Sequence, residues 1–490
     1  MNLQINKQSV TPVYKQIANG IWALIREEEL VNGYKLPSER QLARELGVHR
    51  NTVVRAYEEL IAEGLVVAQR TSPRGYFVLR NEKIREGNLF FPLSKMIRYQ
   101  FSPDEKTFAQ IFEDSGADNY ITLAGIVMDE KLSPALWMDE IFDEMKAGRW
   151  AQNAKTQESR EIARLKENIC RLLRGRNMYV NPKNVQLVLE TTHALSVIIE
   201  MYLEKGDCVI VEEPVIPDTV NLFRNRGIET VYVSMEADGF NLKEMEILLM
   251  NKNPKFIYVM TNYQSPSGTV MSLEKRKALL ALSHKYGVPI IEEDSVWDFN
   301  YTGKKMPTLY SMDCYKSVLY IDTFSLTFLP GIKTAFVVGP YEPIDMMGRY
   351  IIMSQVSIGN IGQYMLNEFI ERGAYEKYLK MMCAAYKRKM ELLCERLETI
   401  EEIRFTKPQG GLNIWCSLAP PLNEKELYLT CRGLGLLIMP GYLFYPRGYH
   451  GQGHVRLCFA NIEETRIDEA VSLLKQGIAM TLEKAEERKK

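Results

Sequence analysis

The sequence predicts an α/β protein in which a small helical module precedes a large domain built on a mostly parallel sheet. From about residue 119 onwards, helical patterns alternate with short apolar runs, which read VQLVL, CVIVEE, FIYVM, VPIIEED, VLYID and TAFVVG. Near-continuous apolar strands separated by helices are typical of a parallel sheet that is covered on both faces. Before residue 80, apolar residues instead recur at helical spacing, which indicates a separate module.

The first 80 residues contain three expected helices and a hairpin. Thr11-Pro12 begins the first helix, because proline is favoured at the first helical position. Ser38 and Gln41 form a capping box for the second helix, and Gly47 ends it. The third helix follows a three-residue turn and reads RNTVVRAYEELIAEG. Two short strands, LVVAQ and YFVL, then flank the basic turn RTSPRG.

A helix-turn-helix followed by a basic hairpin is a winged helix, which binds DNA by placing its third helix in the major groove. Arg50, Asn51 and Thr52 open that helix and are the expected base-reading residues. The expected phosphate-positioning residues are Ser38, Arg40, Arg55, Arg74 and Gly75. The alternative is a protein-interaction domain made of three solvated amphipathic helices, which fits the order of cap, turn, helix and wing less well.

Three segments carry a resemblance to a known family: PVYKQI, LPSERQLARELGVHRNTVVRAYEEL and AEGLV with its wing. Over about 70 residues they resemble the GntR-type winged helix in residue type and spacing. The resemblance implies that residues 1–80 bind operator DNA.

The composition is that of an ordinary globular protein. The chain has 490 residues, enough for about three domains. Its 46% hydrophobic and 25% charged residues exclude disordered and collagen-like chains. The net charge of the whole chain is near zero, with 61 basic and 62 acidic residues. Residues 1–80 contain 11 of the basic residues and 8 of the acidic ones. The module is therefore mildly basic and the remainder mildly acidic.

Composition also limits location and cofactor type. Neither an apolar run of about 18 residues nor a basic-then-apolar leader occurs, so we expect a cytoplasmic protein without a membrane partner. The eight cysteines are spread singly, which fits reduced thiols. His450 and His454 lie four residues apart without a neighbouring carboxylate or cysteine, so we expect no metal site.

Residues 81–118 mix charge with scattered aromatic residues and show no sustained period, so we expect a linker there. The remaining residues, 119–490, form the large domain. We expect a larger subdomain over about 119–370 and a smaller α+β subdomain over about 371–490, which contains the segments GLNIWCSL and HVRLCFA.

The order of motifs in this domain resembles the class I aminotransferase fold over about 350 residues. The matching segments are GIVMDEKLSPALW, THALSVIIEMYLEKGDCVIVEEP, QSPSG, IIEEDS, TFSLTFLPGIK and VRLCFA. Together with the winged helix, the chain resembles a MocR-type regulator. The resemblance implies a fold type I aminotransferase-like domain, pyridoxal phosphate as cofactor, a small-molecule effector and a head-to-tail homodimer.

The same resemblance places the cofactor residues. Pyridoxal phosphate enzymes need a lysine for the Schiff base, an acid for the ring nitrogen and donors for the phosphate. In this chain the lysine position is Leu326, so neither a catalytic residue nor covalent attachment is expected. Lys333 stands where the family has its phosphate-binding arginine, and Ser325 is a further cofactor-binding position. Glu293 and Asp294 keep the acidic character of the pair expected near the ring.

Further positions depart from the family pattern. Ser295 stands where a tyrosine is expected, Ile216 replaces another tyrosine, and Glu190 begins the turn that should present amides to phosphate. A carboxylate there repels a phosphate. Arg456 still matches the arginine that binds a substrate carboxylate.

Three readings of the large domain follow. The leading one is an effector-sensing, dimerising domain without transaminase chemistry. The second is a regulator or aminotransferase that retains pyridoxal phosphate non-covalently through residues such as Asp294 and Lys333. The third is a dimerisation scaffold that binds nothing small.

Overall fold

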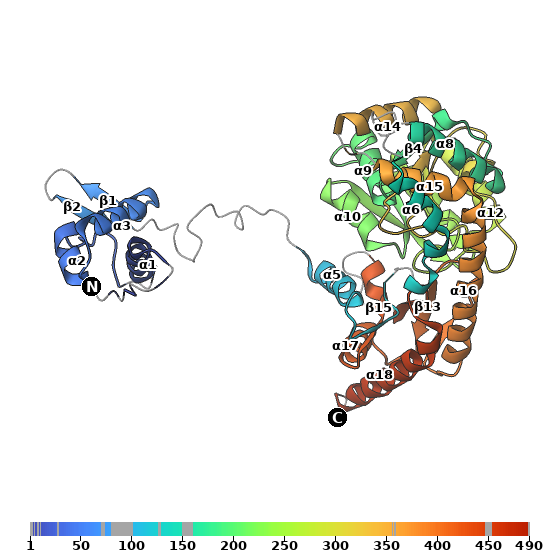
Figure 1. Cartoon of the computed structure of the whole chain (residues 1–490). Coiled ribbons are helices and arrows are strands. Elements are labelled where there is room, and N and C mark those ends of the chain that lie inside the picture. Colours follow the sequence, from blue (N-terminus) through green and yellow to red (C-terminus); the bar gives the residue numbers. More distant parts are fainter. Residues whose placement is uncertain are drawn as a thin grey trace. The chain divides into compact units, whose positions relative to one another are not determined.

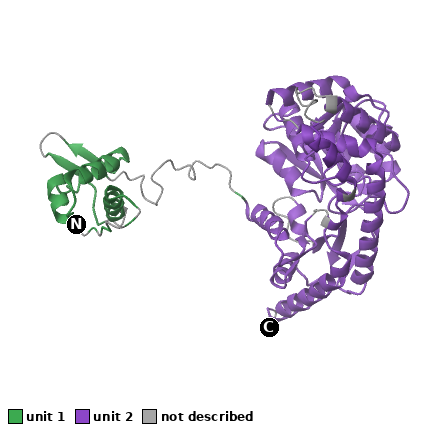
Figure 2. Ribbon diagram, viewed as in Figure 1, with its two compact units in different colours: residues 1–101 green, residues 102–490 purple. Residues whose placement is uncertain are grey.

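A computed structural model describes residues 3, 5, 6, 9, 11–26, 29–69, 74–79, 101–125, 129–148, 160–354, 356, 359–445 and 453–488 of the chain. The chain divides into two compact units, residues 1–101 and 102–490, coloured green and purple in Figure 2. Each unit has a hydrophobic core of its own.

Unit 1 is a winged helix. Its elements are α1 (Val13–Arg26), α2 (Glu39–Leu46), α3 (Arg50–Ala62), β1 (Val66–Gln69) and β2 (Gly75–Val78) (Figure 1). The two strands pair antiparallel, and Lys35 forms a further antiparallel bridge with Phe77 of β2. The three helices and the hairpin confirm the fold expected for this module. Residues 70–73, which include most of the basic turn, lie outside the described residues.

The helix ends of unit 1 follow from its sequence. Ser38 is the N-cap of α2, and its hydroxyl accepts a hydrogen bond from the Gln41 amide at 3.3 Å. Gly47 ends the helix with φ 62°, a left-handed conformation that glycine adopts without a Cβ penalty. His49 caps α3, because its Nδ1 accepts from the Asn51 amide at 3.2 Å. The start of α3 is therefore fixed by a side chain.

Unit 2 contains an eight-stranded sheet in the order β4-β11-β10-β9-β8-β5-β6-β7. The strands are β4 (Val185–Val188), β5 (Cys208–Glu213), β6 (Glu229–Glu236), β7 (Gly239–Phe240), β8 (Phe256–Val259), β9 (Ile290–Glu293), β10 (Val318–Thr323) and β11 (Ala335–Val338). The neighbouring strands β6, β5, β8, β9 and β10 pair in parallel, in that order across the sheet. Strand β11 is antiparallel to both of its neighbours, β10 and β4. Each of the six apolar runs singled out in the sequence is a strand.

Helices cover both faces of this sheet. One face packs against α9 (Thr191–Tyr202), α10 (Pro217–Asn225) and α14 (Tyr341–Ser354). The other face packs against α8 (Arg160–Leu173), α11 (Leu242–Lys252), α12 (Leu273–Tyr286), α13 (Leu309–Met312), α15 (Asn360–Glu371) and α16 (Ala374–Leu397). The architecture is the mostly parallel α/β sheet that the sequence predicts.

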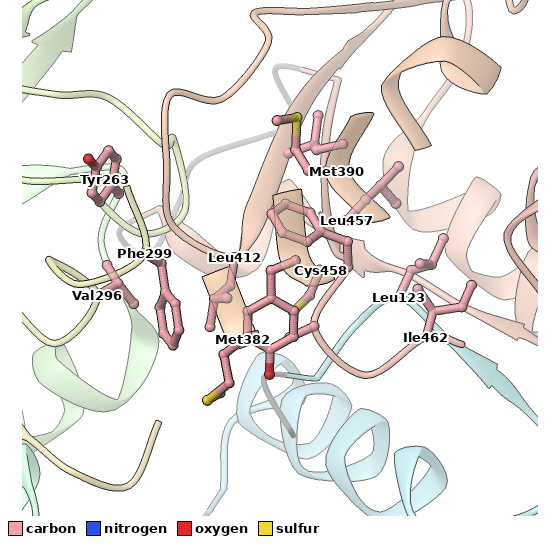
Figure 3. Close-up of a cluster of buried hydrophobic side chains, with 14 of the residues drawn as sticks. Leu123, Tyr263, Val296, Phe299, Met382, Met390, Leu412, Leu457, Cys458 and Ile462 are labelled. Carbon is pink, nitrogen blue, oxygen red and sulfur yellow. The ribbon is translucent and has the colours of Figure 1, made fainter. Parts of the chain in front are cut away.

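A smaller subdomain follows with a four-stranded antiparallel sheet, in the order β12-β13-β16-β15. Its strands and helices are β12 (Ile403–Phe405), β13 (Asn413–Leu418), α17 (Glu424–Gly433), β14 (Leu436–Leu437), β15 (Met439–Pro440), β16 (His454–Cys458) and α18 (Ile467–Glu487). The largest hydrophobic cluster joins both subdomains. Figure 3 shows part of it, including Leu123, Met382 of α16 and Leu457 of β16.

The structure differs from the expected linker at residues 103–115, which form helix α5 (Pro103–Ser115) of unit 2. A capping box starts this helix. The Ser102 hydroxyl accepts a hydrogen bond from the Glu105 amide, and the Glu105 carboxylate accepts one from the Ser102 amide. Asp114 pairs with Arg432 of α17 at 2.7 Å. Only Ile111 of α5 is buried, and so weak an apolar stripe explains why the sequence shows no helical period. Residues 81–100 lie outside the described residues.

The boundary expected at residue 119 also differs. Strand β3 (Ile121–Thr122) pairs in parallel with β14 of the smaller subdomain. The amide of Leu123 donates to Leu437, and its carbonyl accepts from Cys458, at 2.8 and 2.7 Å. The first residues of the expected larger subdomain thus belong to the smaller one. A helix, α6 (Asp139–Lys146), follows before α8.

A membrane-spanning helix and a metal site can be looked for only among the described residues. Among the described residues, no helix is both long and apolar enough to span a membrane. The same residues contain no group of His, Cys, Asp and Glu that could hold a metal ion. His450 lies outside them.

Candidate functional site

The first candidate site is the amino end of α3. Arg50 and Asn51 are exposed and Thr52 is partly buried. The guanidinium of Arg50 contacts the Glu39 carboxylate twice, through Nε at 2.9 Å and Nη2 at 2.6 Å. Both donors bind the same oxygen of Glu39, Oε2, so the carboxylate orients the exposed Arg50 guanidinium at the start of α3.

Glu39 connects three elements and was not identified from the sequence. Its carboxylate accepts from Arg50 of α3 and from the Tyr76 hydroxyl of β2 at 2.5 Å, while Glu39 itself begins α2. The Tyr76 hydroxyl, followed by Arg50, holds the pKa of Glu39 below its usual range. Because Arg50 lies 11 positions and Tyr76 37 positions away, no local pattern signals the contact.

Four of the expected phosphate-positioning residues, Ser38, Arg40, Arg55 and Arg74, are exposed. Arg55 also lies over Tyr14 of α1, with its guanidinium carbon 4.0 Å from the ring centroid. Gly75 allows a close approach within the wing, because a Cβ there would lie 2.8 Å from the Lys35 side chain.

The second candidate site lies at the carboxyl end of β10, where ligands of parallel sheets bind. The Glu190 carboxylate is the centre of a polar cluster there. It accepts from the hydroxyls of Ser325 and Thr323 at 2.6 and 3.2 Å, and it pairs with the Lys333 ammonium at 2.8 Å. Leu326 is partly buried and packs against the largest hydrophobic cluster.

Glu293 and Asp294 point to opposite faces of the sheet. Glu293 is the register partner of Ile321, which faces α9 and α10, and it accepts from the Tyr258 hydroxyl at 2.8 Å. Asp294 is bound by Asn262 at 3.0 Å and by the Tyr320 hydroxyl at 3.2 Å. Burial raises the pKa of both carboxyl groups. Both acids are thus already bound by internal donors.

Arg176 forms a buried ion-pair cluster with two aspartates. This residue was not identified from the sequence. It pairs with Asp298 at 2.8 Å and Asp322 at 2.6 Å. Burial raises the pKa of Asp322 to about 6, although Arg176 opposes the shift. The guanidinium also stacks on Trp297 beside a cavity of about 420 Å³. Arg176 is one of three arginines in RLLRGRNMYV, and nothing in this segment signals its partners, which lie more than a hundred residues away.

Arg456 of β16 is buried between the subdomains. Its guanidinium donates to the Ala124 carbonyl and lies 5.0 Å from the Phe444 ring centroid. Burial lowers the pKa of Arg456 to about 10, and nearby Asp218 of α10 opposes the shift. Its Nε has no acceptor among the residues that the structure describes. A buried guanidinium with a free donor is suited to binding a carboxylate.

These features define a class of protein: a DNA-binding winged helix joined to an aminotransferase-fold domain. Residues 130–474 match the family model "Aminotransferase class I and II", and residues 13–78 match "Bacterial regulatory proteins, gntR family". The chain belongs to the aminotransferase class I and II family and carries a gntR-family domain in front.

Relatives with both parts are similar along nearly their whole length. The HTH-type transcriptional regulator YdfD of Bacillus subtilis is 24% identical over 460 residues, which cover 93% of this chain and 94% of the relative. The probable rhizopine catabolism regulatory protein MocR of Rhizobium meliloti is 24% identical over 491 residues, covering 97% and 95%. The 2-aminoadipate transaminase of Thermus thermophilus is 25% identical over 304 residues, covering 61% and 76%.

Solved structures confirm the fold of unit 2. An archaeal alanine:glyoxylate aminotransferase matches with a TM-score of 0.73 and 24% identity, covering 80% of this chain and 100% of that one. Kynurenine aminotransferase of Pyrococcus horikoshii, solved in complex with PMP, matches with a TM-score of 0.71 and 24% identity, covering 80% and 97%. Pyridoxal phosphate is therefore the cofactor that this family implies.

The residues of this chain do not fit that cofactor. Leu326 has no amine for a Schiff base. The hydroxyls of Ser325 and Thr323 and the ammonium of Lys333 already hold the Glu190 carboxylate. Two like charges 4 Å apart repel by about 1 kcal/mol in water and about 4 kcal/mol at an effective dielectric of 20. All three donors are thus already bound to an internal carboxylate.

Proposed function

We propose that this protein is a transcription regulator whose winged helix reads operator DNA and whose aminotransferase-fold domain senses a small effector without transaminase chemistry. The gntR-family domain and the full-length regulator relatives support DNA-binding regulation. The observation that carries the proposal is the contrast between two sites. Arg50 and Asn51 are exposed for DNA, while Leu326 and Glu190 replace the chemistry of a transaminase.

On DNA, Arg50, Asn51 and Thr52 contact base edges, whereas Ser38, Arg40 and Arg74 contact phosphates. This division follows from exposure and position on α2, α3 and the wing. Gly75 supports the wing. Arg55 neutralises charge near the backbone while it packs against Tyr14.

For the effector, we propose a carboxylate ligand held by Arg456. The orphaned Nε supports this role, because a buried donor without an acceptor is costly and a ligand carboxylate would satisfy it. The position of Arg456 between the subdomains lets a ligand there bias their arrangement. Such a ligand changes DNA binding only if it has different affinities for two arrangements.

We also propose a homodimer, for which a head-to-tail arrangement follows from the family resemblance. Helix α14 supports it with an exposed apolar row at helical spacing: Met346 is 58% exposed, Tyr350 36% and Met353 84%. Exposed apolar patches of this kind commonly mark interfaces. A symmetric dimer with two winged helices recognises a repeated operator sequence.

The test of DNA reading is selection of duplexes from a random library with the full chain, followed by titration of the selected and a scrambled duplex. We expect the selected duplex to bind roughly a thousandfold more tightly. Arg50→Ala should remove most of this preference. Equal binding of both duplexes at low salt would contradict the proposal.

The test of sensing is thermal unfolding of the full chain with amino acids, other small carboxylates and vitamers. We expect a concentration-dependent stabilisation by at least one carboxylate. It should be lost in Arg456→Gln and kept in Arg404→Gln, whose arginine is exposed on β12. Absence of any ligand effect would favour the dimerisation scaffold, and a visible absorption band with pyridoxal phosphate would favour the enzyme.

A further inference from the structure

Donor side chains from two places in the chain converge on the carboxylate of a third, Glu190, at the carboxyl end of β10. Ser325 and Thr323 come from the end of that strand, and Lys333 lies just before β11. Glu190 lies 135 positions before Ser325, between β4 and α9. The four side chains form what we call the anion cradle: three donors, with the Glu190 carboxylate between them.

The cradle has the composition of an anion-binding site. Two hydroxyls donate to the carboxylate at 2.6 and 3.2 Å, and one ammonium lies at 2.8 Å. The carboxylate also belongs to the residue that precedes α9, a helix of 12 residues. The amino end of a helix attracts negative charge through its unpaired amides and its dipole. These donors would suit a phosphate as well as a carboxylate.

The conformation of Glu190 is explained by the cradle and not by its own helix. Glu190 is the N-cap of α9, a position that favours Ser, Thr, Asp and Asn because their short side chains bond the first turn. The Glu190 side chain makes no such bond. It reaches across to Ser325 and Thr323 instead. A residue unsuited to capping thus holds the centre of an anion site.

We infer that Glu190 is a built-in anion that takes the place of a ligand's phosphate and excludes phosphorylated ligands from this site. Glu190 keeps the cradle neutralised and folded without a cofactor. If the proposed effector extends to the anion cradle, the part of the effector that lies there carries no phosphate group. This statement about the effector rests on the proposed sensing function, whereas the role of Glu190 does not.

Removing the Glu190 carboxylate should convert the cradle into an open site. Lys333 is then left with two hydroxyl donors and the amino end of α9, and Glu190 is its only ion-pair partner among the described residues. Glu190→Ala therefore creates both the space and the unbalanced positive charge that a phosphate needs. Glu190→Gln removes the charge but keeps the side-chain volume, so it should gain less affinity for phosphate than Glu190→Ala does.

The experiment titrates inorganic phosphate into the full chain by calorimetry for wild type, Glu190→Ala, Glu190→Gln and Glu246→Ala. The last is a matched control, because Glu246 pairs with Lys285 at 2.7 Å on α11 and α12, away from the cradle. We expect Glu190→Ala to bind phosphate at least about tenfold more tightly than wild type. The control should match wild type.

A second measurement uses wild type alone, so it remains decisive if Glu190→Ala does not fold. Binding of pyridoxal phosphate and pyridoxal is compared by equilibrium dialysis. We expect the two vitamers to bind within about threefold of each other, or not at all. A preference of wild type for pyridoxal phosphate of about tenfold or more would overturn the inference. So would a folded Glu190→Ala protein that gains no phosphate binding. Neither result depends on DNA binding, so failure here is distinct from failure of the proposed regulator function.

Discussion

Glu39 is a positioning residue whose effect on DNA reading can be tested directly. Its carboxylate fixes the Arg50 guanidinium and ties it to Tyr76 of the wing. Glu39→Gln weakens this hold and removes a negative charge beside the DNA. We expect binding to unrelated duplexes to rise slightly and discrimination of the selected operator to fall by about 1 kcal/mol, at the low end for one base contact.

The measurement is fluorescence anisotropy with the selected and a scrambled duplex at one fixed salt concentration. Glu45→Gln is the matched control, because it makes the same charge change at an exposed position of α2. If both variants lower discrimination equally, the contact between Glu39 and Arg50 plays no part in reading.

Glu212 predicts a pH dependence of stability. It is buried in β5, one of its oxygens has no partner among the described residues, and burial raises its pKa from 4.5 to about 8. Between these values the unfolded chain has lost the proton that the native protein keeps. Stability contributed by this group is therefore complete below about pH 4.5 and is lost as the pH rises towards 8.

The measurement is urea unfolding of the full chain between about pH 5 and about pH 8, which is the window set by this shift. Glu212→Gln mimics the protonated acid and should flatten the decline, by up to several kcal/mol at about 1.4 kcal/mol for each pKa unit. Parallel pH profiles for wild type and variant would show that Glu212 is not the group responsible.

For single residues, the sequence predicts which residues belong to a site better than it predicts which residues contact one another. The resemblance identifies Leu326 and Lys333, and the structure places Lys333 beside Ser325 as parts of one cluster. The partner that joins them is Glu190, which the sequence indicates only as a source of repulsion. Likewise, nothing local to Arg176 predicts its two aspartates, because contacts across more than a hundred residues depend on the whole sheet.

Among the elements, α14 carries the prediction about association. Met346, Tyr350 and Met353 share one helix face, and Met353→Asp places a charge at the carboxyl end of the apolar row, on its most exposed member. We expect the dimer to dissociate at least about tenfold more readily, because an unpaired charge in an apolar interface is costly. Sedimentation velocity over a concentration series measures this.

Met250→Asp provides the control, since Met250 is also strongly exposed but lies on α11. Equal effects of both substitutions, or a wild type that is monomeric at all concentrations, would contradict the role of α14.

The elements also show where pattern reading succeeds. Near-continuous apolar runs predicted the buried strands, because parallel strands covered on both faces have no polar side. Strand β6 was not among those runs, since its burial alternates along ETVYVSME. Helix α5 was missed because it is held by its capping box and by polar contacts, with a single buried residue.

For the whole molecule, the two separate cores predict two independent folding units. Residues such as Ile17 and Leu60 form the core of unit 1, and none of that cluster belongs to unit 2. We expect a fragment of residues 102–490 to unfold at the same temperature as the corresponding transition of the full chain. Differential scanning calorimetry of both proteins measures this, and a shift of more than about 5 °C would indicate stabilisation by unit 1.

The attachment of α5 has a consequence for the point at which the chain enters unit 2. This helix bridges the subdomains of unit 2, because Glu105 pairs with Arg224 of α10 and Asp114 pairs with Arg432 of α17. A rotation of one subdomain against the other must stretch one of these two ion pairs or carry the helix along. The chain that leads from the DNA-reading unit arrives at the start of this helix. Any rotation that carries α5 along therefore displaces the point at which the chain enters unit 2.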